Sequence, residues 1–215
     1  MNFKKKITID KKLQKTFSFQ LPIPKPLFYQ KPARLRFEIS EEMYQNKKAM
    51  MREVMEKSEA LFKEVFKHSK KMWILLQFYA PKKLKENKLP NGFSDLIEKC
   101  KYKIQASDIY EMKEYRRTKD EGSGYFYYYA IEKKPNFNLI KAIIWAIGGF
   151  DIGVHPSSEV QAFFIDFQKE IIFHLYDDRG LDIIANKKEV LQKCYEKYSN
   201  WILESNRSEI DKIFG

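Results

Sequence analysis

Two apolar runs, residues 171–176 and 181–185, are separated by four mostly charged residues: Asp177, Asp178, Arg179 and Gly180. The runs are rich in β-branched and aromatic side chains, which favour strands. Asp suits the first position of a type I turn because its carboxylate accepts backbone hydrogen bonds. Gly suits the last position, where a positive φ is needed. The pattern therefore predicts a β-hairpin with an unusually charged tip.

Earlier segments carry strand and helix patterns in alternation. Residues 34–39 alternate strictly between polar and apolar side chains, as a half-buried strand does. Residues 46–68 repeat apolar side chains every three or four positions, which is typical of an amphipathic helix. The continuous apolar run 72–79 predicts a central strand, and the aromatic run 125–131 has very high strand propensity.

The remaining assignments are mostly helical. Residues 136–147 are apolar almost all round, so we expect a buried helix that ends at Gly148-Gly149. Residues 188–203 predict an amphipathic helix, and a last short helix ends at Phe214, with Asn206 and Glu209 as candidate caps. Residues 159–167 predict a further strand.

Residues 82–120 carry weaker signals. They suggest a turn at 90–92, a short helix at 93–100 and a strand at 103–107. Residues 111–120 are charged and receive no assignment.

This order of elements favours an α+β fold, with helices packed on a mostly antiparallel sheet in a single domain, residues 34–215. Residues 1–33 are rich in lysine and contain Pro22, Pro24, Pro26 and Pro32. Proline lacks a backbone donor and disfavours helix, so we expect an extended basic arm with at most a short helix before it.

Composition narrows the class of protein. Among 215 residues, 44% are hydrophobic, which is enough for a core, yet no apolar stretch reaches the roughly 18 residues that a membrane span needs. The two cysteines, Cys100 and Cys194, show no zinc spacing, so we expect free thiols, no metal and no cofactor. A soluble cytoplasmic protein that does not contact the membrane is the expectation.

The charged turn is the leading candidate site. Asp177, Asp178 and Arg179 are interpreted first as a structural turn and second as an exposed contact surface. Together with Asp182 the two carboxylates could hold a divalent cation, but further oxygen ligands would have to converge from elsewhere. Arg36, on the polar face of the 34–39 strand, is a further candidate binding residue.

The histidines give a second set of candidates. His155 lies in a loop beside Ser157 and Ser158, and a loop histidine is the better functional candidate. His174 lies in an apolar strand run, where we expect it to be packed rather than catalytic. Ser157 lacks the strand–turn–helix context of a hydrolase nucleophile.

A net charge of +11 and the tyrosines of residues 125–129 raise the alternative of nucleic-acid binding, with Arg116 and Arg117 nearby for phosphate. The other interpretation is a sheet strand with aromatic side chains on both faces. The absence of an RNA-binding signature favours the strand.

Several segments together resemble an uncharacterised bacterial family that is described only as a domain of unknown function and is common in Bacillus-like genomes. They are residues 26–29, 35–38, 142–156, 176–180 with Asp182, and 201–207, and the most specific is Tyr-Asp-Asp-Arg-Gly at 176–180. Here Glu204-Ser205-Asn206 precedes Arg207, where the family has a more acidic pair. The resemblance implies a single cytoplasmic domain and supplies no activity or catalytic residues.

Three functions remain open at this point. The first is a non-enzymatic module that binds a still unidentified protein partner, of the immunity or regulatory type. The second is a weak nucleic-acid-associated protein, and the third is an enzyme that uses the Asp177-Asp178 turn and His155. The oligomeric state is left open.

Overall fold

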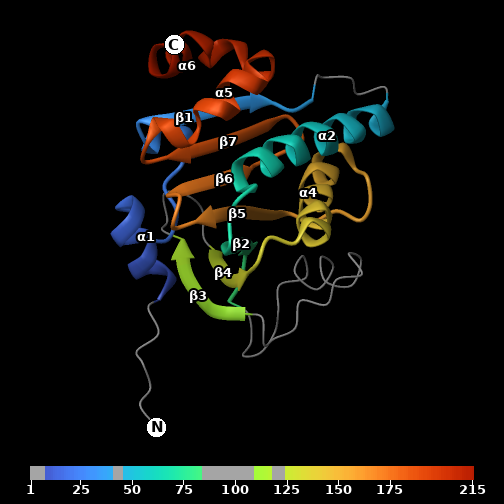
Figure 1. Cartoon of the computed structure of the whole chain (residues 1–215). Coiled ribbons are helices and arrows are strands. Elements are labelled where there is room, and N and C mark those ends of the chain that lie inside the picture. The colour runs from blue at the N-terminus through green and yellow to red at the C-terminus, as the bar shows by residue number, and fades with distance from the viewer. Residues whose placement is uncertain (1–7, 41–45, 84–108, 118–123) are drawn as a thin grey trace.

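A computed structural model describes residues 8–40, 46–83, 109–117 and 124–215 (Figure 1). Its centre is a seven-stranded sheet in the order β1-β7-β6-β5-β2-β4-β3, and each neighbouring pair is antiparallel. The predicted α+β class is confirmed. The strands are β1 (Ala33–Glu38), β2 (Met72–Ala80), β3 (Ile109–Arg117), β4 (Gly124–Lys133), β5 (Val160–Asp166), β6 (Ile171–Leu175) and β7 (Gly180–Ala185).

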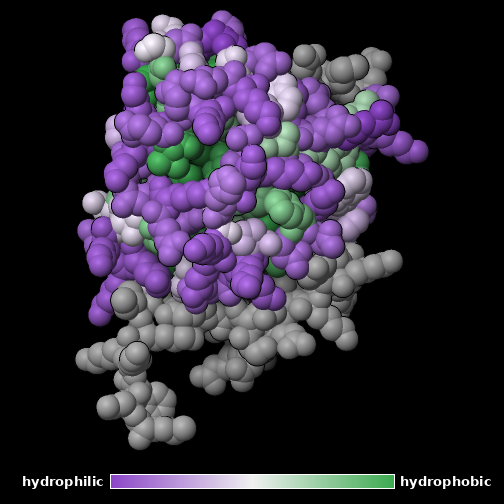
Figure 2. Space-filling view, in the orientation of Figure 1, coloured by the Kyte–Doolittle hydropathy of each residue, from purple (hydrophilic) through white to green (hydrophobic). Residues whose placement is uncertain are grey.

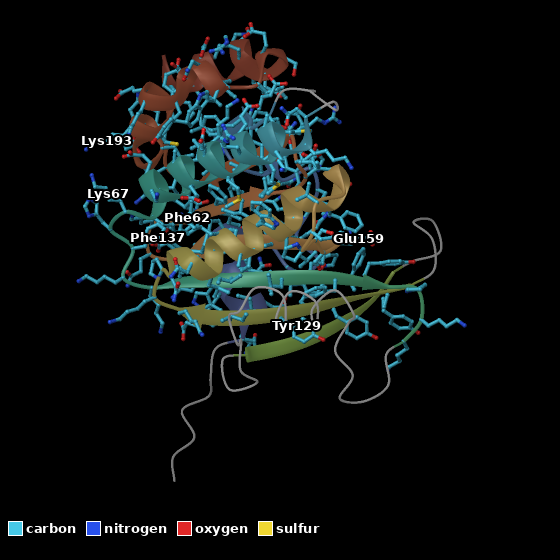
Figure 3. All side chains as sticks on the ribbon, turned by 90° about the vertical axis from the view of Figure 1, so that its right-hand side faces the viewer. Phe62, Lys67, Tyr129, Phe137, Glu159 and Lys193 are labelled. Carbon is cyan, nitrogen blue, oxygen red and sulfur yellow. The ribbon has the colours of Figure 1, made fainter. Side chains whose placement is uncertain are left out.

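One face of the sheet carries the larger hydrophobic core. It is covered by α2 (Lys47–Phe66), α4 (Phe137–Ile152), α5 (Gln192–Tyr198) and α6 (Glu204–Phe214). The Phe62 ring of α2 stacks on Phe66 at 4.4 Å between centroids and packs edge-on against Phe164 and Phe173 of the sheet. Figure 3 shows Phe137, the first residue of α4, beside Phe62.

The N-terminal segment covers the other face. It contains α1 (Ile9–Phe17) and the 3-10 turn η1 (Leu27–Gln30), and Thr8 caps α1 by accepting a hydrogen bond from the Lys11 amide. In Figure 1, α1 lies on the opposite side of the sheet from α2 and α4. The apolar side chains of this segment are buried against the sheet: Ile9, Leu13, Phe17, Phe19, Leu21, Ile23 and Leu27.

The prediction that Gly148-Gly149 ends α4 is wrong. The helix continues to Ile152 and ends at Gly153, which has a φ of 71°. A Cβ at Gly148 would lie only 2.7 Å from Cγ1 of Val54 on α2. The glycine is therefore required by the close approach of α2 and α4 and not by a helix end.

Other assignments differ at their ends. Residues 188–203 do not form one helix but two 3-10 turns around the seven-residue α5. After the second turn, Ile202 leaves the helical conformation and forms a bridge with Phe37 of β1. The last helix begins at Glu204, so Asn206 lies inside it. Residues 109–117 form β3, which the sequence pattern left unassigned. The predicted elements at 90–92, 93–100 and 103–107 lie outside the described residues.

Figure 2 shows hydrophilic residues over most of the face in view, with apolar residues visible between them over the middle of the molecule. In the part of the chain that the structure describes, no helix combines the length and the apolar character needed to cross a membrane.

Candidate functional site

Two neighbouring cavities lie at the end of the sheet where β2 and β6 finish and β5 and β7 begin. Three residues line both cavities: Lys25 from the N-terminal segment, Gln161 from β5 and Tyr176 after β6. Lys25 Nζ donates a hydrogen bond to Gln161 Oε1, so this pair spans the boundary between the cavities.

We call the first cavity the end cleft. Its volume is about 500 Å³, and α4, β2, β4 and β5 contribute to its wall. Besides the three shared residues it is lined by Gln77, Tyr79, Phe126, Ile147, Phe150, Asp151, Ser158, Glu159 and Val160. Two of these side chains are large and exposed, Tyr79 at 39% and Phe150 at 44%.

We call the second cavity the inner cavity. Its volume is about 460 Å³, and it lies between the N-terminal segment and the sheet. Besides the shared residues it is lined by Pro26, Leu27, Arg36, His174 and Asp182. Two residues that the sequence analysis selected, Arg36 and Asp182, thus face the same cavity although 146 positions separate them.

Arg36 and Asp182 form an ion pair with two hydrogen bonds. Arg36 Nε donates to Oδ1 of Asp182 at 2.7 Å, and Nη2 donates to Oδ2 at 2.9 Å. The Arg36 guanidinium also lies over the Phe28 ring, 4.6 Å from its centroid. Burial raises the pKa of Asp182, and the hydrogen bonds from Arg36 oppose that rise. The pair therefore positions a guanidinium at the wall of the inner cavity.

His174 lies next to this pair on the same face of the sheet. It stands opposite Asp182 on β7 and opposite Phe163 on β5, whose ring stacks on the imidazole at 4.2 Å. The side chain is 4% exposed, and within the described residues neither ring nitrogen has a hydrogen-bond partner. Burial lowers the pKa of His174 to about 3, so the imidazole is neutral at pH 7.

The charged turn between β6 and β7 forms with the hydrogen bonds that the sequence predicts. Asp177 Oδ1 accepts hydrogen bonds from the amides of Arg179, at 2.9 Å, and Gly180, at 2.6 Å. The Asp178 carbonyl accepts a hydrogen bond from the Ser40 hydroxyl at 2.7 Å. These contacts fix the turn to the chain that follows β1.

The expected positive φ at Gly180 is wrong, since Gly153 is the one glycine with positive φ in the described residues. Gly180 is needed for another reason. The Tyr176 ring crosses it so closely that a Cβ at Gly180 would lie 1.9 Å from the Tyr176 hydroxyl oxygen. The glycine therefore lets the tyrosine that lines both cavities lie against the start of β7.

Carboxylates gather near the turn. Burial and the charge of Asp177 raise the pKa of Asp151, near the C-terminal end of α4, while Arg179 opposes the rise. The pKa of Asp178 is raised by burial and, to a smaller extent, by Asp177 and Asp151. Within the described ranges, however, no three His, Cys, Asp or Glu side chains are grouped so that they could hold a metal ion.

His155 is exposed and lines neither cavity. Its Nδ1 lies 3.2 Å from the Ser157 hydroxyl, in a pair that is open to solvent. Cys194 is a free, buried thiol, and Cys100 lies outside the described residues. Burial raises the pKa of the Cys194 thiol, so it is not a reactive thiolate at pH 7.

Three tyrosines of the aromatic run are buried, and they lie on both faces of the sheet. Tyr127 and Tyr129 contribute to the core beneath α2 and α4, and Tyr128 contributes to the core beneath α1. All three are at most 5% exposed, so they cannot stack on bases. The interpretation as a strand with aromatic side chains on both faces is correct.

Sequence reasoning missed three residues of the inner cavity: Lys25, Gln161 and His174. His174 could have been recognised as a candidate site residue because it is a polar residue inside an apolar strand run. Such a residue, when buried, needs a polar partner. No local pattern marks Lys25 or Gln161, since they meet only through the fold.

Comparison with known proteins identifies the family. The model of a family described as "Domain of unknown function (DUF3885)" matches residues 9–206, which is most of the chain, and the chain belongs to that family. The expected resemblance to an uncharacterised Bacillus-type family is confirmed. The chain is 24% identical over 196 residues to the uncharacterized protein YnaE of Bacillus subtilis strain 168, covering 79% of this chain and 85% of YnaE. No solved structure matches.

Proposed function

We propose that this member of the DUF3885 family is a cytoplasmic binding protein, of the immunity or regulatory type, that holds a protein partner in the end cleft without catalysis. The observation that carries the proposal is that Tyr79 and Phe150 are both exposed, at 39% and 44%, and line the same cleft. Large aromatic side chains supply much of the binding energy of protein interfaces when a partner removes them from water.

The charges of the cleft indicate the chemistry of the partner. Asp151 and Glu159 line it beside the two aromatic side chains. A positive charge placed nearby would favour the ionised carboxylate of Asp151, whose pKa is raised by burial and by Asp177. The cleft therefore fits a segment that presents a lysine or arginine next to an apolar side chain, although this chain itself has a net charge of +11.

Two observations support binding over hydrolysis or nucleic-acid contact. The His155–Ser157 pair is exposed to solvent and lies outside the end cleft and the inner cavity. Of the tyrosines proposed as a base-stacking platform, Tyr127, Tyr128 and Tyr129 are buried in the sheet. A substrate bound in either cavity would not contact the His155–Ser157 pair, and a nucleic-acid strand on the surface would not reach the buried tyrosines.

The test is affinity capture from an extract of the native host with matched variants. Phe150→Ala and Phe137→Ala each remove one exposed aromatic ring from α4, but Phe137 is at the opposite end of the helix, on the side away from Glu159 (Figure 3). We expect one captured protein to be retained by Phe137→Ala and lost with Phe150→Ala and with Asp151→Arg.

Thermal melts confirm that each variant is folded before capture. Half of every sample is treated with nuclease. Capture that persists in both Phe150→Ala and Asp151→Arg would contradict the proposal. Capture that disappears after nuclease treatment would favour the nucleic-acid alternative instead.

A further inference from the structure

The inner cavity contains a buried polar side chain that has no hydrogen-bond partner among the described residues. His174 is 4% exposed, and both of its ring nitrogens lack hydrogen bonds to any described residue. Such groups cost free energy when they are left unsatisfied, so buried imidazoles are normally paired with protein, water or a ligand. His174 lines the inner cavity, where a bound molecule can satisfy it.

The charge of the cavity favours an anion. Its lining contains two cations, Lys25 and Arg36, and one carboxylate, Asp182. Asp182 engages Nε and Nη2 of Arg36, which leaves Nη1 without an acceptor among the described residues. The lining residues therefore include one more cation than carboxylate, and the guanidinium that is already held in place offers a further donor.

The neutral state of His174 determines what it contributes. With a pKa of about 3, lowered by burial and by the charges of Lys25 and Arg36, the imidazole adds no further charge at pH 7. It offers one N–H donor and one nitrogen acceptor. A single negative charge thus matches the cavity, because a dianion would leave one charge uncompensated in a partly buried site.

The remaining wall is apolar. Pro26 and Leu27 from the N-terminal segment line the cavity with the ring of Tyr176. The volume of about 460 Å³ is within the usual range for small-molecule sites. The cavity thus combines polar donors with a surface that can cover a short apolar body.

We infer that the inner cavity is a binding site for a small organic monoanion, a carboxylate on a short apolar body. The carboxylate accepts hydrogen bonds from Lys25, Arg36 Nη1 and His174, and the apolar body lies against Pro26 and Leu27. The inference goes beyond protein binding at the end cleft and does not depend on it, because the end cleft lacks both Arg36 and His174.

The test uses benzoate as the probe, with benzamide as the uncharged analogue of the same shape and inorganic phosphate as a second anion. Binding to the full chain is measured by isothermal titration calorimetry and by the ring resonances of His174 in nuclear magnetic resonance spectra. We expect benzoate to bind and to shift the His174 resonances, and benzamide to bind at least about tenfold more weakly, because the hydrogen bonds to a charged group are lost.

Three variants make the test specific. Lys25→Gln removes the exposed cation, and His174→Phe removes the buried donor while keeping a flat ring against Phe163. Each should weaken benzoate binding by about tenfold or more. Lys193→Gln, an exposed lysine on α5 outside both cavities, should leave binding unchanged.

Several results would overturn the inference: no benzoate binding, equal binding of benzoate and benzamide, a preference for phosphate, or binding that Lys25→Gln leaves unchanged. The capture experiment with Phe150→Ala measures protein binding at the end cleft and not benzoate binding. A negative result in one experiment therefore leaves the other proposal unaffected.

Discussion

Arg36 on β1 and Asp182 on β7 stand directly opposite each other in the sheet and share two hydrogen bonds, while the Asp182 side chain is 2% exposed. Such an ion pair is costly to break, because the remaining charge is largely buried and only partly solvated by water. The pair lies beside His174 and lines the inner cavity. Loss of the Arg36–Asp182 ion pair should therefore also change the shape of the inner cavity.

Replacing Asp182 with asparagine should lower the free energy of unfolding by about 3 kcal/mol, because Arg36 keeps its charge without a compensating carboxylate. Urea denaturation measures the change. Glu204→Gln is the matched control, since it removes a carboxylate from the exposed Arg207–Glu204 pair, in which Glu204 is 83% exposed. That control should change the free energy by less than about 0.5 kcal/mol. Equal losses in the two variants would contradict the role of burial.

Gly180→Ala should lower the free energy of unfolding by about 1–3 kcal/mol, because the new Cβ displaces the Tyr176 ring that lies against this position. A double-mutant cycle with Tyr176→Ala checks the cause. If the ring is responsible, Gly180→Ala should cost much less in the Tyr176→Ala background. An undiminished cost would mean that the backbone at Gly180 is responsible.

Gly148→Ala tests the packing of α4 on α2. At an unhindered helix position this substitution stabilises by about 1 kcal/mol, because alanine has the higher helix propensity. Here the added methyl group meets Val54 Cγ1 at 2.7 Å, so we expect the sign to reverse and the midpoint of urea unfolding to fall. Combination with Val54→Ala should recover part of the loss. A stabilised single variant would show that the two helices adjust at little cost.

His174 predicts a pH dependence of stability. Its pKa is about 3 in the folded chain and 6.5 in its ordinary state, so the unfolded chain binds the extra proton between these values. Neutral His174 thus makes its full contribution to the free energy of unfolding above about pH 6.5. As the pH falls towards about 3, this contribution is lost by up to about 1.4 kcal/mol per pH unit. Urea unfolding at pH 7 and pH 5 measures it. The fall should be smaller in His174→Phe than in the original chain, and equal falls would contradict the burial of a neutral imidazole.

Much of the fold follows from local patterns in the sequence. Alternation in residues 34–39 and the apolar stripe of residues 46–68 correspond to β1 and α2, because backbone geometry sets periods of two and 3.6 residues. The Asp177 turn is also local, since its carboxylate bonds amides two and three residues ahead. These features need no information from distant parts of the chain.

The tertiary structure decided the rest. The continuation of α4 through Gly148 depends on Val54, and β3 is a strand through its pairing with β4. The inner cavity assembles Lys25, Arg36, His174 and Asp182 from separate segments, and the hydrogen bonds and burial that give these groups their properties act across the sheet. Sequence spacing does not encode such contacts, because they exist only after apolar burial has brought the N-terminal segment and the strands together.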